Sequence, residues 1–202
     1  MPSDPQGIDP HFDYEHGILK NLPGYTAQAK LDRFEAAESA AANIRLKINP
    51  VKGAFDSAHL KEIHFCIFQN IYSWAGEYRQ VNIRRSASYF FALVQFMETN
   101  LKNTLAKLTA ENHLKGLDAA AFASRAAYYL GELNAIHPFR EGNGRTQREF
   151  IRELAFEAGH CINWSHVSRE QMYEASIESH NLGKNDAFAA LIRSAIDTTL
   201  RP

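Results

Sequence analysis

The residues from His137 to Arg148, HPFREGNGRTQR, combine a histidine, a carboxylate, arginines and a Gly-Asn-Gly turn. A histidine in a loop accepts a proton near neutral pH, because its unperturbed pKa lies near 6.5. The backbone N–H groups of a glycine-rich turn, followed by a helix N-terminus, form a site for an anion. These residue types therefore predict an anion site beside a general base.

The arginines after the turn support this interpretation. Arg145, Arg148 and Arg152 recur at helical spacing and are expected on one face of the helix. Arginine is unfavourable in a first helical turn, because the N-terminal end of the helix dipole is positive. A bound polyphosphate removes this conflict. Glu141 is then placed to hold Mg²⁺ on the phosphates, and His137 to activate a hydroxyl group.

Each of these features also has an ordinary structural explanation. A Gly-Asn-Gly sequence is often only a turn, and an arginine stripe is usually a solvated helix face. His-Pro-Phe is also a plain helix stop, since proline disfavours the helical conformation of the residue before it. Their combination within one short stretch favours a functional site.

The elements that must position this stretch are helical. Apolar residues recur at spacings of three and four along most of the chain. In the first helix this stripe contains Leu31, Phe34, Ala37, Ala41, Ile44 and Ile48, and Thr26 is the expected N-cap. Either Asp56 or Ser57 caps the second helix, whose stripe holds Leu60, Ile63, Ile67 and Ile71. Helices are expected near residues 26–48, 57–71, 93–108, 118–136, 144–158, 168–181 and 186–200.

Two segments depart from the helical pattern. Residues 1–25 are rich in proline, glycine and aspartate and predict an irregular lead-in. Residues 77–92 alternate weakly between apolar and polar residues, which indicates a β-hairpin flap. The sequence thus predicts an all-α helical bundle with a short hairpin beside the active-site loop.

The bulk composition limits the classes of protein. The chain has 202 residues, 45% of them hydrophobic, which suits one domain with one core. Its net charge of −1 argues against nucleic-acid binding through bulk electrostatics. Cys66 and Cys161 are too few for a disulfide framework and are expected to be reduced. No stretch predicts a membrane span or a Sec-type signal, so we expect a cytoplasmic bacterial protein; export directed from elsewhere in a longer chain stays open.

The stretch HPFREGNGRTQR resembles, at every position, the signature H-P-F-x-[D/E]-G-N-G-R-x-x-R of the Fic (filamentation induced by cAMP) family. The stretches FDSAHLKEIHFCIFQNIYSWAGEYRQVNI and GLDAAAFASRAAYYLGELNAIHPF also resemble the family, so the likeness covers nearly all of residues 1–202 as a single Fic domain. It points to the bacterial FicT toxin branch. The resemblance implies AMPylation, the transfer of AMP from ATP to a Tyr, Ser or Thr hydroxyl of a target protein, with release of pyrophosphate.

The resemblance also implies roles for individual residues. His137 would deprotonate the target hydroxyl, and Glu141 would coordinate Mg²⁺. Arg145 would bind the β-phosphate and Arg148 the γ-phosphate of ATP, while Phe139 would pack beneath the loop. The anion hole around the α- and β-phosphates would consist of Gly142, Asn143 and Gly144.

The flap differs from that of many relatives, and Glu178 and Gly144 bear on the nucleotide site. Many relatives carry Lys-Gly in the flap where this chain has Arg84, Arg85 and Ser86, so a contact of Arg85 with nucleotide is only a guess. Together with Ile83 these residues would align the target by strand addition. Glu178 lies where relatives approach the adenine, although a solvated helix face explains it equally well. Gly144 is intact; phosphorylating relatives have lysine there, so its presence favours AMP transfer.

Many family members are inhibited by a helix with the pattern [S/T]-x-x-x-E-[G/N], whose glutamate pairs with the second motif arginine. In this chain only Ser73 has a glutamate four residues later, Glu77, and Tyr78 follows it. We therefore expect an antitoxin-like partner whose glutamate reaches Arg148 in trans. The resemblance makes DNA gyrase and topoisomerase IV the favoured targets, with host GTPases, modified by an effector, as an alternative.

Two other functions were considered. A zinc hydrolase is disfavoured, because His59 and His64 are five residues apart and do not share one helix face as a zinc-binding pair must; His64 is expected to be packed. A module that binds a nucleotide or partner without transferring AMP remains open, although the motif lacks none of its parts.

Overall fold

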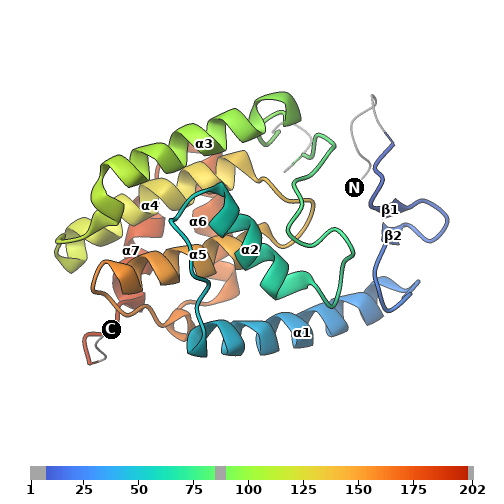
Figure 1. The fold of residues 1–202 in the computed structure, drawn as a ribbon, viewed down its shortest axis with the longest axis horizontal. Coiled ribbons are helices and arrows are strands. Elements are labelled where there is room, and N and C mark those ends of the chain that lie inside the picture. Colours follow the sequence, from blue (N-terminus) through green and yellow to red (C-terminus); the bar gives the residue numbers. More distant parts are fainter. Residues whose placement is uncertain (1–7, 85–89, 200–202) are drawn as a thin grey trace.

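The computed structural model describes residues 8–84 and 90–199, and these residues form an all-α fold (Figure 1). Within them the model contains seven α-helices, as expected. Two short 3₁₀ turns, η1 (Asn112–Leu114) and η2 (Trp164–His166), join helices. The α-helices are α1 (Gln28–Ile48), α2 (Ser57–Phe68), α3 (Val94–Ala110), α4 (Ala119–Ile136), α5 (Asn143–Glu157), α6 (Arg169–Leu182) and α7 (Asp186–Ala195).

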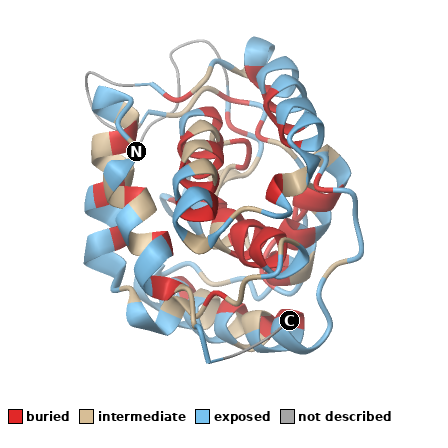
Figure 2. Cartoon of the chain, turned by 90° about the vertical axis from the view of Figure 1, so that its left-hand side faces the viewer, coloured by how far each residue is buried: buried red, intermediate tan, exposed pale blue. Residues whose placement is uncertain are grey.

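Helix α4 is the centre of the bundle and contacts α3, α5, α6 and α7, while α2 packs against α1 and α5. The inner helices carry most of the buried residues, and α1 and α3 lie on opposite outer sides (Figures 1 and 2). Small residues let the helices approach closely: a Cβ on Gly131 of α4 would lie 2.3 Å from Oδ1 of Asn185, the residue before α7. The hydrophobic core thus surrounds α4 from Phe122 onward.

The helix starts are partly as expected. Asp56 caps α2, because its carboxylate accepts a hydrogen bond from the His59 N–H at 2.9 Å. Helix α1, however, begins after Ala27 and has no side-chain cap, so the prediction of Thr26 as its N-cap is wrong. The stripe of α2 residues is buried as predicted.

The buried face of α1 follows the predicted apolar stripe only in part. Leu31 is buried as expected, but Ile44 and Ile48 are 60% and 72% exposed. The inward face continues instead through Ser39 and Leu46, with Glu35 on the same side by helical spacing. The prediction failed because this face covers the polar N-terminal end of α5 as well as the apolar core. A count of apolar residues does not detect such a contact.

The two segments outside the helices also differ in part from expectation. The lead-in contains a short antiparallel hairpin, β1 (Phe12–Asp13) and β2 (Ile18–Leu19), so it is not wholly irregular. In the predicted flap, Arg84 and Phe90 form an isolated antiparallel bridge. Arg85 and Ser86 lie outside the described residues.

Cys66 and Cys161 are free thiols, as expected. Across residues 8–84 and 90–199, no helix has both the length and the apolar character needed to cross a membrane.

Candidate active site

The C-terminus of α4 places His137 in the site. Helix α4 ends at Ile136, and His137 takes the left-handed conformation, with φ 51° and ψ 63°. The last carbonyls of a helix lack partners within the helix. Here they accept hydrogen bonds from other segments: Leu133 from Gln147 Nε2 at 3.0 Å, and Ala135 from the Ala92 N–H at 3.0 Å. The chain after the flap is thereby joined to the end of α4.

Arg79 completes this cap. It is 2% exposed and lies against the negative end of the α4 dipole. Its guanidinium donates to the carbonyl oxygens of His137 at 2.8 Å and Ile136 at 3.3 Å. It also donates to Val81 and Ala92, on either side of the flap. Burial lowers the pKa of Arg79 to about 10, so the arginine remains charged at neutral pH and joins the flap to the histidine loop.

Stacking and a carbonyl contact help to hold the imidazole of His137. Its ring lies parallel to that of Phe91, with centroids 3.7 Å apart and planes 15° apart. Its Nδ1 lies 3.3 Å from the carbonyl oxygen of Asn134. A carbonyl only accepts, so the neutral ring carries its proton on Nδ1 and its lone pair on Nε2. This is the tautomer that a general base needs.

Beneath the loop, His64 and Asn143 fix the backbone. His64 donates from Nε2 to the Glu141 carbonyl at 3.0 Å and accepts the Gly76 N–H at Nδ1. Its ring stacks on Phe139 at 3.9 Å. The Asn143 side chain exchanges two hydrogen bonds with the Phe139 backbone, at 2.9 and 2.7 Å. The Asn143 side chain therefore holds the turn, and only its backbone is left for an anion.

The start of α5 has the features of an anion site. Gly142 has φ 79°, and a Cβ there would lie 2.2 Å from the Phe68 ring, so only glycine fits. The helix begins with no side-chain cap and no acidic residue in its first turn. The first N–H groups of α5 lack intrahelical acceptors, and the positive end of its dipole lies at the same place.

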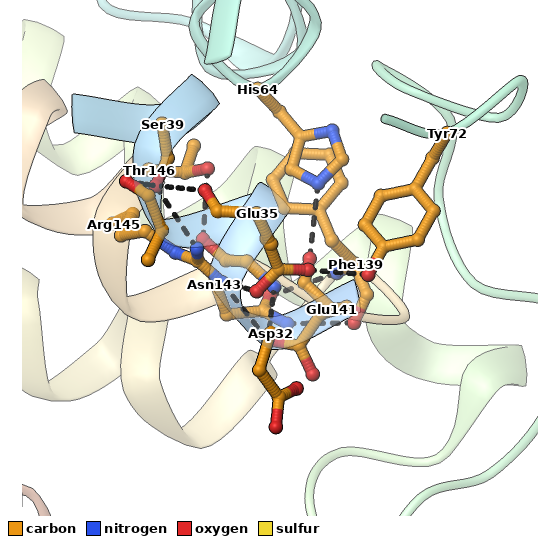
Figure 3. Close-up of polar contacts among 12 residues, drawn as sticks. Asp32, Glu35, Ser39, His64, Tyr72, Phe139, Glu141, Asn143, Arg145 and Thr146 are labelled. Atoms are coloured by element: carbon orange, nitrogen blue, oxygen red, sulfur yellow. Dashed lines mark hydrogen bonds and ion pairs between the residues drawn. The ribbon is translucent and has the colours of Figure 1, made fainter. Parts of the chain in front are cut away.

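Arg145 and Arg148, one turn apart on α5, have different surroundings. Arg145 pairs with Glu35 of α1 at 2.5 Å and donates to Ser39 at 3.2 Å (Figure 3). Arg148 is half-buried, and no carboxylate within the described part of the chain pairs with it. Burial, with the nearby charge of Arg145, lowers the pKa of Arg148 to about 10. Arg148 is therefore a charged group still able to bind an anion.

A cavity of about 340 Å³ opens beside these two arginines. Arg152 also lines it, so the three arginines share one face of α5 as expected. Arg152 is buried and pairs with Glu149 at 2.6 Å and with the Leu46 carbonyl at 3.1 Å. Further cavity residues include Lys47, Arg169, Ser168 and Trp164. The cavity is thus cationic beyond the motif itself.

Residues 54–155 match the family model described as Fic/DOC family. The chain belongs to the Fic/DOC family. The matched residues include the whole of the loop, the start of α5 and the two segments that flank the flap. Helix α1, which supplies Glu35 and Ser39, lies outside them.

Known Fic proteins resemble the chain over most of its length. Protein adenylyltransferase VbhT of Bartonella schoenbuchensis is 47% identical over 92% of this chain, which spans only 38% of VbhT. The probable protein adenylyltransferase y4lH of Sinorhizobium fredii is 34% identical, with 89% of this chain and 91% of y4lH covered. A Bartonella quintana Fic domain with bound ADP has a TM-score of 0.87 at 33% identity, covering 93% and 94% of the two chains.

The other predicted site residues of this Fic domain lie on α6 and beside the flap. Glu178 is half-buried on α6, and its assignment to the adenine remains a prediction. Arg84 is exposed and lies over the Phe90 ring at 4.2 Å, while Ile83 is half-buried and its carbonyl accepts from Phe91. Their role in target docking is likewise still a prediction.

At this site the carboxylate of Glu141 would hold a metal ion together with phosphate oxygens, and not as one of several protein ligands. Glu141 is 44% exposed at the mouth of the turn, and its Oε1 accepts the Gly142 N–H at 2.8 Å. Mg²⁺ commonly uses one or two carboxylates together with phosphate oxygens. Among the described residues no cluster of three or more His, Cys, Asp or Glu is able to hold a metal. His59 is buried against Glu153 at 2.7 Å, and His64 is packed as expected.

Three residues important to this Fic site were missed in the sequence. Arg79 and Phe91 lie in the segment interpreted only as a flap, and Glu35 lies on a helix interpreted through its apolar residues. The one available signal was Arg79 itself, a charged residue next to the alternating positions of a predicted hairpin. Val81 is close in sequence, but the carbonyls of Ala92, Ile136 and His137 are not, so spacing does not reveal these contacts.

Proposed function

We propose that this chain is a protein adenylyltransferase, which transfers AMP from ATP to a hydroxyl side chain of a target protein. The observation that carries the proposal is the juxtaposition of two features. One is His137, with its lone pair on Nε2; the other is the uncapped start of α5 beside Arg145 and Arg148. A base beside a triphosphate-sized anion site suits nucleotidyl transfer.

In this reaction His137 Nε2 accepts the proton of the target hydroxyl, and the oxygen forms a bond to the α-phosphorus. The bond from that phosphorus to the α–β bridging oxygen breaks, and pyrophosphate leaves. The N–H groups at the start of α5 stabilise the phosphate oxygens, while Arg145 and Arg148 neutralise the leaving group. Mg²⁺, when held through Glu141 and phosphate oxygens, supplies further positive charge.

The intact Gly144 supports AMP transfer over phosphate transfer. Gly144 is exposed, and a Cβ there would meet only the Arg148 guanidinium, at 3.6 Å. Packing therefore does not require glycine at this position. A long cationic side chain here would enter the space in front of the helix, where we place the phosphates.

We further propose that the enzyme is a bacterial toxin restrained by an antitoxin whose glutamate pairs with Arg148. Arg148 supports this idea, because it is half-buried and has no carboxylate partner in residues 8–84 and 90–199. A charge-assisted pair at such a site contributes about 1.5–3 kcal/mol. If the isolated chain is inactive and nontoxic without a partner, the proposal of inhibition in trans is contradicted, because there is no activity for a partner to inhibit.

The proposed targets are DNA gyrase and topoisomerase IV, through a Tyr, Ser or Thr acceptor. One observation favours the alternative of an effector acting on host GTPases: the B. quintana relative is described as a VirB-translocated effector protein. Mass spectrometry of bacterial and host lysates treated with the chain, ATP and Mg²⁺ will separate the two by the protein that gains AMP.

A labelling experiment tests the transfer itself. Incubation with lysate and α-labelled ATP should label a target protein, whereas γ-labelled ATP should not. His137→Ala should abolish labelling and leave ATP binding intact, because a positioned base contributes about 10²–10⁴-fold. Label from γ-labelled ATP alone would indicate a kinase. Nucleotide binding without any label would indicate a binding module.

A further inference from the structure

Helix α1 supplies the β-phosphate arginine of the proposed site with a carboxylate partner. Glu35 lies 15% exposed on the inward face of α1, and its Oε1 accepts from Arg145 at 2.5 Å. Ser39, one turn later, accepts from the other terminal nitrogen of the same guanidinium at 3.2 Å. Both residues precede the segment that matches the Fic model, and neither belongs to the motif.

Glu35 is itself fixed on its second oxygen. The Tyr72 hydroxyl donates to Glu35 Oε2, and the Tyr72 ring is buried against Trp74 with centroids 4.3 Å apart. Figure 3 shows Tyr72, Glu35 and Arg145 joined in one chain of contacts. Both carboxylate oxygens of Glu35 therefore accept hydrogen bonds, and its backbone belongs to a long helix. These contacts hold the side chain in one orientation.

The guanidinium of Arg145 is held from two directions. Glu35 and Ser39 bind its terminal nitrogens, and the Phe68 ring lies 4.8 Å from its central carbon. Glu141 Oε1, at the mouth of the turn, makes a longer contact of 3.5 Å with the nitrogen that binds Glu35. The Arg145 Nε–H has no acceptor in the described residues, and the side chain is 22% exposed and lines the cationic cavity. One side of the guanidinium is thus immobilised while another stays open to an anion. Arg148 has no such support.

We propose that Glu35 is a positioning residue, which together with Tyr72 and Ser39 holds Arg145 in the orientation that receives the β-phosphate. This inference rests on the proposed contact of Arg145 with that phosphate. A free arginine side chain must lose the freedom of several rotatable bonds when it binds. Because Glu35 orders the side chain beforehand, this loss no longer weakens phosphate binding.

The test is titration calorimetry of the full chain with AMP and with ADP, in the presence of Mg²⁺. Glu35→Ala should weaken ADP about tenfold, the effect expected of one charge-assisted contact, and leave AMP unchanged. Glu35→Gln should stay within about threefold of wild type, because its amide oxygen still accepts from Arg145. Asp32→Ala is the matched control, since Asp32 is an exposed acid one turn earlier on α1.

The outcomes separate this inference from its alternatives. Tighter ADP binding by Glu35→Ala would mean that Glu35 competes with the phosphate, which overturns the proposal. Equal weakening of AMP and ADP would assign Glu35 a merely structural role. If Arg145→Ala weakens AMP and ADP alike, the β-phosphate contact is wrong and the inference falls with it. Failure of adenylyl transfer would instead appear in the labelling experiment and leave the ADP-to-AMP comparison intact.

Discussion

The two halves of the candidate site are held by different forces. In the base half, the Phe91 ring and the Asn134 carbonyl contact His137, and the buried guanidinium of Arg79 donates to carbonyls. In the phosphate half, charged side chains lie close together, and Arg145 is balanced by Glu35 while Arg148 is not.

This difference follows from what each half must do. A general base needs one ring orientation and one tautomer, and the Phe91 ring and the Asn134 carbonyl favour both. An anion site must keep unsatisfied positive charge, which a full set of carboxylate partners would cancel. Changes in the base half are therefore expected to lower activity through loss of packing around His137. Changes in the phosphate half are expected to act through loss of positive charge or of the contacts that support the loop.

The largest effect is expected from Arg79→Met. The substitution removes the donor from four carbonyl oxygens, two of them at the end of α4. At about 1 kcal/mol for each carbonyl, the free energy of unfolding should fall by about 4 kcal/mol. Urea denaturation measures this loss. Adenylyl transfer should fall with it, because the His137 loop loses its support.

Arg79→Lys is the control for charge. Its single nitrogen keeps the cation at the end of α4 but does not reach all four carbonyls, so it should restore only part of the stability. If the folded fraction of Arg79→Met binds ADP as wild type does, this result would support the view that the base half and the phosphate half are held independently. Stability equal to wild type in Arg79→Met would show that the carbonyls find other donors.

The second-largest effect is expected at acidic pH, where protonation of His64 should destabilise the fold at the loop beneath the phosphates. Burial, with the charge of Arg145 nearby, lowers the pKa of His64 to about 4. In the unfolded chain the pKa is near 6.5, so protons bind preferentially to the unfolded state between these values. Stability is therefore complete above pH 6.5 and falls toward pH 4, by about 3 kcal/mol in total. Protonation would also set an Nδ1–H against the Gly76 N–H.

Thermal melting of wild type and His64→Gln at several pH values measures this dependence. Glutamine still donates to the Glu141 carbonyl but does not titrate, so its melting temperature should change less between pH 7 and pH 4. An identical acid response in the two proteins would assign the loss to other groups.

The smallest effect is expected from Phe91→Leu, which keeps an apolar side chain but removes the flat ring against His137. An aromatic pair contributes about 0.5–1.5 kcal/mol beyond burial, so the turnover rate should fall about three- to tenfold. The KM for ATP should stay unchanged, because the phosphates lie in the other half. A rise in KM with an unchanged rate would contradict the placement of Phe91 in the base half.

The sequence predicted the helical bundle with little error, because helix starts and stops depend on local patterns. The Pro138 stop, the Asp56 cap and the glycine turn act within a few residues of themselves. The inward face of α1 was mispredicted, since Ile44 and Ile48 face solvent while Glu35 faces Arg145. The partner of that face lies about one hundred residues away, and no local spacing reports it.

The sequence by itself determined which groups are present and in what order: a base, a carboxylate, a glycine turn and two arginines before an amphipathic helix. Only the tertiary structure decided which of those charges remain available. It buried Arg152 against Glu149, set Arg145 against Glu35 and left Arg148 with no carboxylate among the described residues. The physical reason is that a charge is neutralised by the groups that folding brings within about 4 Å, and for Arg145 that group, Glu35, comes from a helix far away in the chain.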